Sequence, residues 1–199
     1  MKKILVLKSS IMGNDSQTNS LIDRYLAERR AKGYEDQIVG HDLTALDLPV
    51  LDGELFSALR GADNISPRAK AAVALSDRLI AELKGSDLLL IGAPMYNLNV
   101  PTQLKNWFDL VARARLTFNY TAAYPVGLVE GVNAVVFSSR GGVHAGQPTD
   151  AVTPYLRSVL GLMGIGEVQF IYAEGLDMKP HGLTQGLANA HQRIVALVG

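Results

Sequence analysis

The sequence predicts an α/β fold: a doubly wound, five-stranded parallel sheet with the strand order 2-1-3-4-5 and helices on both faces. Several short apolar runs, of which Leu88–Ile91 is the clearest, lack the alternation of a strand with one wet face, which is typical of parallel strands covered on both sides. Segments with helical periodicity alternate with these runs along the chain. With short connections and right-handed crossovers, this alternation leads to a doubly wound sheet.

The predicted strands are short segments rich in apolar residues. The second is weaker and partly polar, so we place it at the edge of the sheet. In chain order the strands span Ile4–Leu7, Glu35–Leu43, Leu88–Ile91, Ala134–Phe137 and Val168–Tyr172.

Five helices are predicted from apolar stripes with start and stop signals at their ends. Asp15 or Ser16 is the expected N-cap of the first helix, and Pro67 and Pro101 suit the first turns of the next two. Gly164, with Ile165 behind it, ends the fourth. The five begin at Asp15 or Ser16, Ser66, Pro101, Val152 and His181.

Two segments fall outside this alternation. Residues 44–66 show no clear period, and a loop of that length in a compact domain is usually a functional cover or disordered. Leu116, Phe118 and Tyr120 alternate with polar residues, which predicts a half-buried strand.

Composition excludes several kinds of function. The chain has 19 basic and 19 acidic residues, so its overall charge does not favour nucleic acid or an anionic membrane as a partner. Cysteine is absent, which removes disulfides, thiolate nucleophiles, iron–sulfur clusters and cysteine-based zinc sites. Any redox chemistry must then come from an organic cofactor, and no metal is expected.

Length and hydropathy predict a single domain over residues 1–199. The start, MKKILVL, has too short an apolar core for a signal peptide and no cleavage site. No apolar run approaches the roughly 20 residues of a membrane span. We therefore expect a soluble, cytoplasmic protein.

The stretch from Asp87 to Asp109 holds the first candidate site. Pro94 ends the strand Leu88–Ile91 because proline has no N–H for the ladder, and Met95 to Asn97 then lie beyond the strand's carboxyl end. In doubly wound sheets ligands bind in the crevice outside the carboxyl ends of the strands. Pro94–Asn97 is therefore a predicted binding loop.

The loop after the first strand predicts a monophosphate site. It contains neither G-x-G-x-x-G nor a P-loop, but it places hydroxyls and an amide at the start of a helix, where free N–H groups and the helix dipole favour an anion. Together with the aromatic loop on the third strand, this predicts FMN. The alternative is that Ser16, Gln17 and Thr18 form an ordinary helix cap.

The segment Ser139–Gly142 narrows the choice of ligand further. Two consecutive glycines let the backbone approach a planar ring and offer N–H donors at its edge. Donors at the pyrimidine edge of a flavin favour its reduced, anionic form. Taken alone, the Gly-Gly pair is better explained by a simple turn, and the inference depends on all three loops at three strand ends together.

From Lys3 to about Glu174 the chain resembles the FMN-dependent NADH azoreductases, a flavodoxin-like family that also reduces quinones. The resemblance rests on LVLKSS, SQTNS, APMYN, QLKNWFDLV, SSRGG and TPYL, in this order and spacing. It implies a homodimer with one FMN per subunit near the interface. The implied phosphate site is Ser10, Ser16, Gln17 and Thr18. The implied ring site is Pro94, Met95, Tyr96, Asn97, Leu98, Ser139, Arg140, Gly141 and Gly142.

Leu98 departs from the family, whose members often carry phenylalanine there, and Leu162 is a similar case. Both are predicted to line the substrate side of the flavin. An aliphatic side chain stacks on flat aromatic substrates less well than a ring does. The departure therefore concerns substrate preference more than reaction type.

The hypothesis for the mechanism is a two-step exchange at one flavin face. NADH or NADPH gives a hydride to flavin N5 and leaves, and a quinone or azo compound then takes the electrons. No side chain need act as nucleophile, although His144 is a candidate for proton transfer or a flavin hydrogen bond. Substrate contacts are predicted at Arg60, for the donor's phosphates, and at Phe118 and Tyr120, over the partner's flavin. An ordinary surface position explains His144 equally well. Core packing is the commoner explanation for Phe118 and Tyr120, and a solvated side chain is the default for Arg60.

Three other classes of protein fit the sequence less well. A flavodoxin-type electron carrier shares fold and cofactor, but carriers tend to be acidic and smaller, whereas this chain is neutral and has extra segments at 44–66 and 116–132. A flavin-free signalling domain would need aspartates at strand ends that here read Lys8-Ser9-Ser10 and Ala93-Pro94. A hydrolase lacks both a G-x-S-x-G elbow and an H-E-x-x-H motif. The physiological acceptor and the choice between NADH and NADPH stay open.

Overall fold

The computed structural model describes all residues from Met1 to Gly199. Five parallel strands form one sheet in the order β2-β1-β3-β6-β7, which confirms the predicted 2-1-3-4-5 arrangement of a flavodoxin-like sheet. The strands are β1 (Lys3–Lys8), β2 (Gln37–Asp42), β3 (Leu88–Gly92), β6 (Asn133–Ser139) and β7 (Val168–Ala173). As predicted, the second strand lies at an edge.

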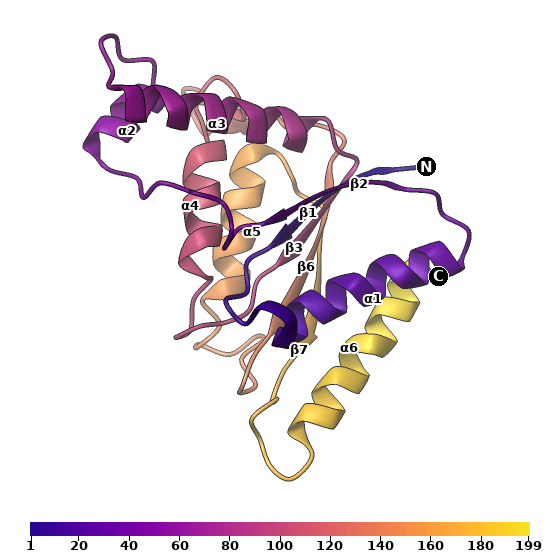
Figure 1. The fold of residues 1–199 in the computed structure, drawn as a ribbon. Helices are drawn as coiled ribbons and strands as arrows, with labels where there is room; N and C mark the ends of the chain where they lie inside the picture. Colours follow the sequence, from indigo (N-terminus) through magenta and orange to yellow (C-terminus); the bar gives the residue numbers. More distant parts are fainter.

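Helices cover both faces of this sheet. Figure 1 shows α1 and α6 on one side, and α3, α4 and α5 on the other. The helices are α1 (Gln17–Ala31), α2 (Gly53–Leu59), α3 (Pro67–Lys84), α4 (Thr102–Val111), α5 (Val152–Met163) and α6 (Gly182–Val198), with a short 3-10 helix η1 (Gly13–Asp15) before α1. No helix combines the length and the apolar character that crossing a membrane requires.

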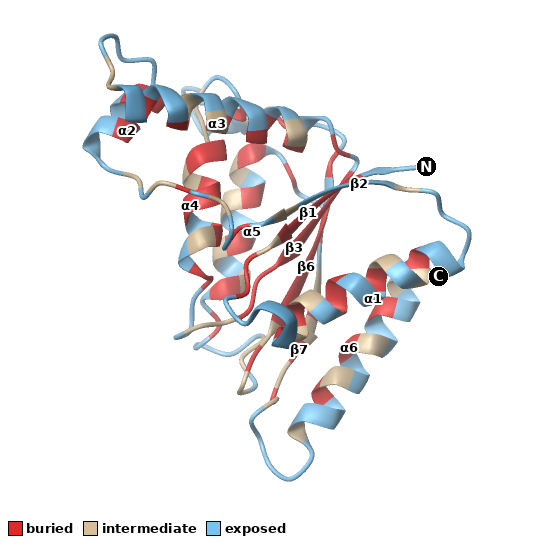
Figure 2. Cartoon of the chain, in the orientation of Figure 1, coloured by how far each residue is buried: buried red, intermediate tan, exposed pale blue.

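The central strands bury side chains on both faces, as their unbroken apolar sequences predict. In β1, Ile4 and Val6 point into the core beneath α1 and α6, whereas Leu5 and Leu7 point into the core beneath α3, α4 and α5. β3 and β6 alternate in the same way, and the buried positions run along the middle of the sheet in Figure 2. The sheet therefore separates two hydrophobic cores.

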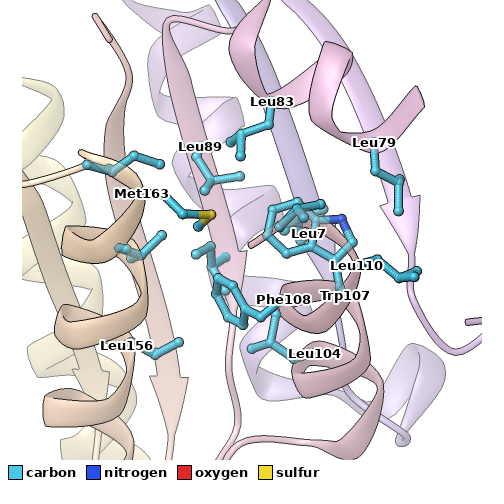
Figure 3. Packing of buried hydrophobic residues seen from close by; sticks show 14 of the residues in the cluster. Leu7, Leu79, Leu83, Leu89, Leu104, Trp107, Phe108, Leu110, Leu156 and Met163 are labelled. Carbon is cyan, nitrogen blue, oxygen red and sulfur yellow. The ribbon is translucent and has the colours of Figure 1, made fainter. Parts of the chain in front are cut away.

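The larger core is centred on α4. Trp107 is completely buried and packs edge-to-face on Phe108, with 5.2 Å between the ring centroids. Figure 3 shows both rings among leucines of the sheet and of α3, with Met163 of α5 close by. This packing anchors α4, and thereby the loop between β3 and α4 that the sequence marks as a binding loop.

The predicted signals of α1, α3 and α5 are found where expected, whereas Pro101, predicted in the first turn of its helix, is the N-cap residue that precedes α4. The Ser16 hydroxyl accepts a hydrogen bond from the Asn19 amide at 3.1 Å, so Ser16 rather than Asp15 caps α1. Ser66 caps α3 in the same way, with Pro67 in its first turn. Gly164 ends α5 in the left-handed conformation at φ 103°, followed by the buried Ile165.

One helix was not predicted. α2 lies inside residues 44–66, where no period was found, and Arg60, which the sequence placed in a loop, is its C-cap. Its seven residues are too few to show a helical period, but Asp52 caps it by accepting the Leu55 amide at 2.8 Å. The half-buried strand expected around Phe118 is only β4 (Phe118–Asn119), which pairs with β5 (Val126–Gly127) as a small antiparallel hairpin.

The end of α1 is fastened to the beginning of β2 by a buried ion pair. The Arg29 guanidinium donates to both carboxylate oxygens of Asp36, at 2.6 and 3.0 Å, and it stacks on the Tyr34 ring. The two charged side chains are only 9% and 6% exposed. Hydrogen bonds from Arg29 hold the pKa of Asp36 below its ordinary value, although burial acts in the opposite direction.

Asp36→Asn should lower the free energy of unfolding at pH 7 by about 3 kcal/mol, because it leaves the buried Arg29 without its partner charge. The Asp36 carboxylate stabilises the fold above its unfolded pKa of about 3.9, and this contribution is lost as pH falls through the lower, folded pKa. Urea unfolding of the variant and of the unchanged protein should therefore converge at acid pH. Glu28→Gln, which breaks the exposed Arg24–Glu28 pair on the same helix, is the control and should cost about 0.5 kcal/mol or less. An equal cost for both variants would contradict the assignment.

Candidate functional site

A crevice of about 430 Å³ lies at the carboxyl ends of β1, β3, β6 and β7. It sits where the chain, having added β2 on one side of β1, crosses over to add β3 on the other, which is the switch point that binds ligands in doubly wound sheets. Its lining residues are Ser10, Met12, Asp15, Ser16, Gln17, Met95, Tyr96, Ser139, Arg140, Gly141, Leu176, Asp177 and Leu183. The structure therefore brings the three predicted loops together.

The first loop presents main-chain donors to this crevice. The amides of Gln17 and Thr18 begin α1 and have no acceptor within the protein. The Thr18 side chain does not face a ligand, because it is buried and its hydroxyl lies 2.6 Å from the Ser139 hydroxyl. The Ser10 hydroxyl lies 2.9 Å from the Tyr96 hydroxyl, which links the first loop to the second.

Charged side chains do not explain anion binding here. Asp15 and Asp177 are the carboxylates on the crevice wall, and its one basic residue, Arg140, has a side chain that is fully buried. Lys8, at the end of β1, is paired with Asp23 at 2.7 Å. An anion in this crevice would therefore be held by N–H groups, hydroxyls and the helix dipole.

The second loop forms a tight turn that projects Leu98. The backbones of Tyr96 and Asn99 exchange two hydrogen bonds of 3.0 Å, and both central residues have positive φ, 49° at Asn97 and 65° at Leu98. This is the pattern of a type I′ turn, which glycine and asparagine adopt more easily than leucine. The Leu98 side chain is 45% exposed, so a strained turn holds an apolar group beside the crevice.

The third loop offers a second pair of free donors. The amides of Gly141 and Gly142 have no acceptor within the protein. A Cβ atom at Gly141 would overlap the Asp177 carboxylate, and one at Gly142 would lie 2.8 Å from His144 Nε2. Those atoms are the ends of side chains that can move, so a Cβ would displace them; with glycine at both positions the loop exposes bare backbone at the crevice.

The loop after β7 also borders the crevice, and the sequence analysis missed it. The amides of Asp177 and Gly175 donate to the carbonyls of Gly141 and Gly142, at 3.0 and 2.9 Å. Leu176 and Asp177 line the crevice themselves. This loop has neither the hydroxyl side chains of the first loop nor the Gly-Gly pair of the third. Its position after β7, the strand next to β6, is the one feature of the sequence that could have predicted its place at the crevice.

Arg140 does not point its side chain into the crevice. Its guanidinium is 0% exposed and lies 3.2 Å from the carboxylate of Asp150 and 3.3 Å from that of Glu174. Burial raises the pKa of Asp150, but hydrogen bonds from Thr153 and Arg140 outweigh it, so this pKa lies below its ordinary value. Its backbone is bonded as well, since the amide donates to the Ala173 carbonyl at 2.9 Å and the carbonyl accepts from the Leu176 amide at 3.1 Å.

His144 lies against the third loop. Its Nδ1 is 2.8 Å from the Thr149 hydroxyl, and its Nε2 lies beside Gly142, in the space that a side chain at that position would need. Its backbone amide donates to Glu174 at 2.8 Å. The structure thus places this predicted residue next to the predicted ring site.

The other predicted substrate residues are not at the crevice. Arg60, Phe118 and Tyr120 share a separate hollow of about 140 Å³, where the Arg60 guanidinium lies 5.0 Å from the centroid of the Phe56 ring. This hollow includes Ala112 and Arg113, just past the carboxyl end of α4, whereas the crevice loop precedes the amino end of that helix. Leu162 lies in the last turn of α5, close to the start of β7 and thus at the opposite end of the sheet.

A further hollow of about 520 Å³ adjoins the second loop on the side of α4 and α5. Its wall includes Lys105, whose ammonium contacts both carboxylate oxygens of Asp109, and Tyr155. Burial, together with the Asp109 charge, raises the pKa of Tyr155, so its hydroxyl stays protonated at neutral pH. The sequence analysis did not single out these residues, because on a helix they match the pattern of an ordinary surface.

Known proteins resemble this chain over its whole length. A family described as having a flavodoxin-like fold matches residues 2–198. A Burkholderia lata protein named FMN-dependent NADH:quinone oxidoreductase 4 is 72% identical, and an Aeromonas salmonicida protein named FMN-dependent NADH:quinone oxidoreductase is 56% identical; each match covers 99% of both chains.

Solved structures agree in fold. The crystal structure of an azoreductase from Bacillus anthracis has a TM-score of 0.88 at 25% identity, covering 100% of this chain and 99% of that one. An FMN-dependent NADH-azoreductase from the same species, solved in complex with FMN, has a TM-score of 0.88 at 22% identity, with coverages of 100% and 98%. With the sequence relatives, these matches confirm the resemblance: the chain belongs to the flavodoxin-like family of FMN-dependent NADH:quinone oxidoreductases.

Proposed function

We propose that residues 1–199 act as one FMN-binding domain that oxidises NADH and reduces quinones and azo compounds. The observation that carries this proposal is the crevice at the switch point, which is lined by Gln17 and Gly141. The amides of these two residues, and those of the adjacent Thr18 and Gly142, have no acceptor within the protein. The high identity to proteins named for this activity supports it independently.

The residues present fit FMN. The amides at the start of α1 and the hydroxyls of Ser10 and Ser16 suit its phosphate without a cation. The bare backbone at Gly141 and Gly142 suits the edge of its ring, with Met95 to Leu98 on the other side. The volume of about 430 Å³ lies within the range of roughly 300–1,000 Å³ that is usual for cofactor sites.

FMN, when bound, supplies the redox chemistry by accepting two electrons from NADH and releasing them to the second substrate. Reduction of a quinone by NADH also consumes one proton, and the product is the hydroquinone. We assign the delivery of that proton to His144, whose Nε2 lies beside Gly142 and whose Nδ1 is held by Thr149. The other residues of the site would bind and orient the cofactor and the substrates.

Two half-reactions test this scheme. Under anaerobic conditions NADH should bleach the yellow protein by itself, and added benzoquinone should restore the colour in the absence of further NADH. Steady-state rates at varied NADH and quinone should then give parallel double-reciprocal lines. A protein that binds FMN but does not oxidise NADH directly would instead be an electron carrier, and reduction only when both substrates are present would exclude the two-step exchange.

We also propose a homodimer in which each subunit completes the site of the other. Arg60, Phe118, Tyr120 and Leu162 all lie away from the crevice of their own chain. Tyr120 is nonetheless 66% exposed, and its ring packs edge-to-face on Phe118, which favours a contact outside the chain's own core. In this arrangement Arg60 would hold the phosphates of the nucleotide donor, and the two aromatic residues and Leu162 would border the flavin of the partner.

Mixing two inactive variants tests this arrangement. Gly141→Phe should lose FMN, because a large side chain at this position would fill the crevice that Gly141 lines, and Tyr120→Ala should lose turnover only. After joint unfolding and refolding, mixed dimers should contain one intact site, which restores about a quarter of the normal activity. No recovery on mixing would show that Tyr120 acts within its own chain, and a monomeric protein in sedimentation would contradict the dimer itself.

Leu98→Phe should change substrate preference. An aromatic ring at this position stacks on flat acceptors, so kcat/KM for a two-ring quinone should rise about two- to tenfold relative to benzoquinone, the equivalent of roughly 0.4–1.4 kcal/mol. Leu116→Phe, at another exposed leucine beyond the end of α4, is the control and should leave the ratio unchanged. An unchanged ratio in Leu98→Phe would remove Leu98 from the substrate wall.

A further inference from the structure

The Arg140 guanidinium is the most completely enclosed charge beside the crevice. All its hydrogen-bond partners are polar side chains beneath the third loop: its Nε donates to the Ser138 hydroxyl at 3.1 Å, and its Nη2 to the Thr153 hydroxyl at 3.1 Å. Its face lies 4.6 Å from the centroid of the Tyr172 ring. A planar guanidinium bonded in several directions cannot turn without breaking several contacts, so it acts as a fixed point.

Glu174 connects this fixed point to the loop above it. Its Oε1 accepts hydrogen bonds from Arg140 Nη1 at 3.3 Å, from the His144 amide at 2.8 Å and from the Ala145 amide at 2.7 Å. The chain between Arg140 and His144 consists of Gly141, Gly142 and Val143. The amides of Leu176 and Asp177 hold the carbonyls of Arg140 and Gly141, at 3.1 and 3.0 Å, and the side chains of Arg140 and Glu174 fix the two ends of the same segment. The free amides of Gly141 and Gly142 are therefore restrained both by the neighbouring loop and by the anchored ends.

This restraint matters because glycine is otherwise the most flexible residue. An unrestrained Gly-Gly pair would sample many directions, and aligning its amides when a ligand develops charge would cost free energy at that moment. Donors that are already aligned stabilise a developing negative charge without that cost. The buried hydrogen bonds of Arg140 and Glu174 can therefore influence the amides of Gly141 and Gly142 without contacting them.

We propose that Arg140 and Glu174 are positioning residues that hold the amides of Gly141 and Gly142 toward the flavin ring and thereby favour its reduced, anionic form. The inference rests on the proposed function, since it needs FMN in the crevice. The Arg140 side chain thus has a different role from the other residues of the Ser139–Gly142 motif. It acts by restraining the loop, whereas they would contact the cofactor.

Two variants separate positioning from a direct effect of charge on the flavin. Glu174→Gln removes a negative charge, which by direct electrostatics would raise the midpoint potential, whereas a less restrained loop would lower it. Arg140→Lys keeps the charge but loses the planar fork, so direct electrostatics predicts no change and positioning again predicts a lower potential. The sign of the shift therefore distinguishes the two explanations.

The measured quantities are the midpoint potential and the dissociation constants of oxidised and reduced FMN. We expect both variants to bind reduced FMN about tenfold more weakly relative to oxidised FMN than the unchanged protein does, which corresponds to a potential lower by about 30 mV. In the protein without FMN, hydrogen exchange at the amides of His144 and Ala145 should accelerate at least tenfold in Glu174→Gln. This second readout does not depend on turnover.

Arg157→Gln is the matched control. Arg157 also stacks on an aromatic ring of β7, 4.7 Å from the centroid of Phe170, and that ring stacks in turn on Tyr172. It has no carboxylate partner and no bond to the loop. Its substitution should leave the potential and the exchange rates unchanged.

The results distinguish this inference from the proposed function. If the unchanged protein binds FMN and oxidises NADH, but the potential stays constant or rises in Glu174→Gln, the positioning role is wrong and the function stands. The same conclusion follows if Arg140→Lys leaves the potential unaltered. If the unchanged protein does not bind FMN, both the function and the inference are wrong.

Discussion

Burial of the central strands on both faces is the constraint on which the rest of this structure depends. β1, β3 and β6 send alternate side chains into two separate cores, so no strand can slip by one residue without moving apolar groups into the wrong core. Their carboxyl ends are therefore held in fixed register, and Gly92, which pairs with Lys8 on one side and Phe137 on the other, marks the common edge. The positions of the binding loops relative to one another are therefore set by this edge of the sheet.

At that edge the loops are also bonded to one another. The Met95 amide donates to the Ser139 carbonyl, the Thr18 and Ser139 hydroxyls are in contact, and the loop after β7 is bonded to Gly141 and Gly142. Such a frame holds main-chain donors in place before any ligand arrives, which is how a protein without cysteine can prepare a site for an organic cofactor. The extra segments, α2 and the β4–β5 hairpin, lie instead toward the other end of α4.

Much of this could be predicted from the sequence, for identifiable reasons. Apolar runs such as Leu88–Ile91, caps such as Ser16 and the left-handed Gly164 are local signals, and each has the predicted role. The direction of a side chain in a loop is not a local property. Arg140 turns into the protein because Asp150 and Glu174, distant in sequence, offer it buried partners, and α2 is too short for a period to reveal it.

The crevice wall exposes no cationic side chain, since that of Arg140 is buried, and this has a consequence for how the proposed cofactor would be retained. Lysine and arginine attract phosphate through a field that dissolved salt screens, whereas hydrogen bonds from Gln17 and Thr18 act only at contact. The binding of a cofactor held in this way would therefore depend only weakly on ionic strength. The carboxylates of Asp15 and Asp177 repel any anion, the cofactor's own phosphate included, so hydrogen bonds at contact would have to outweigh that repulsion.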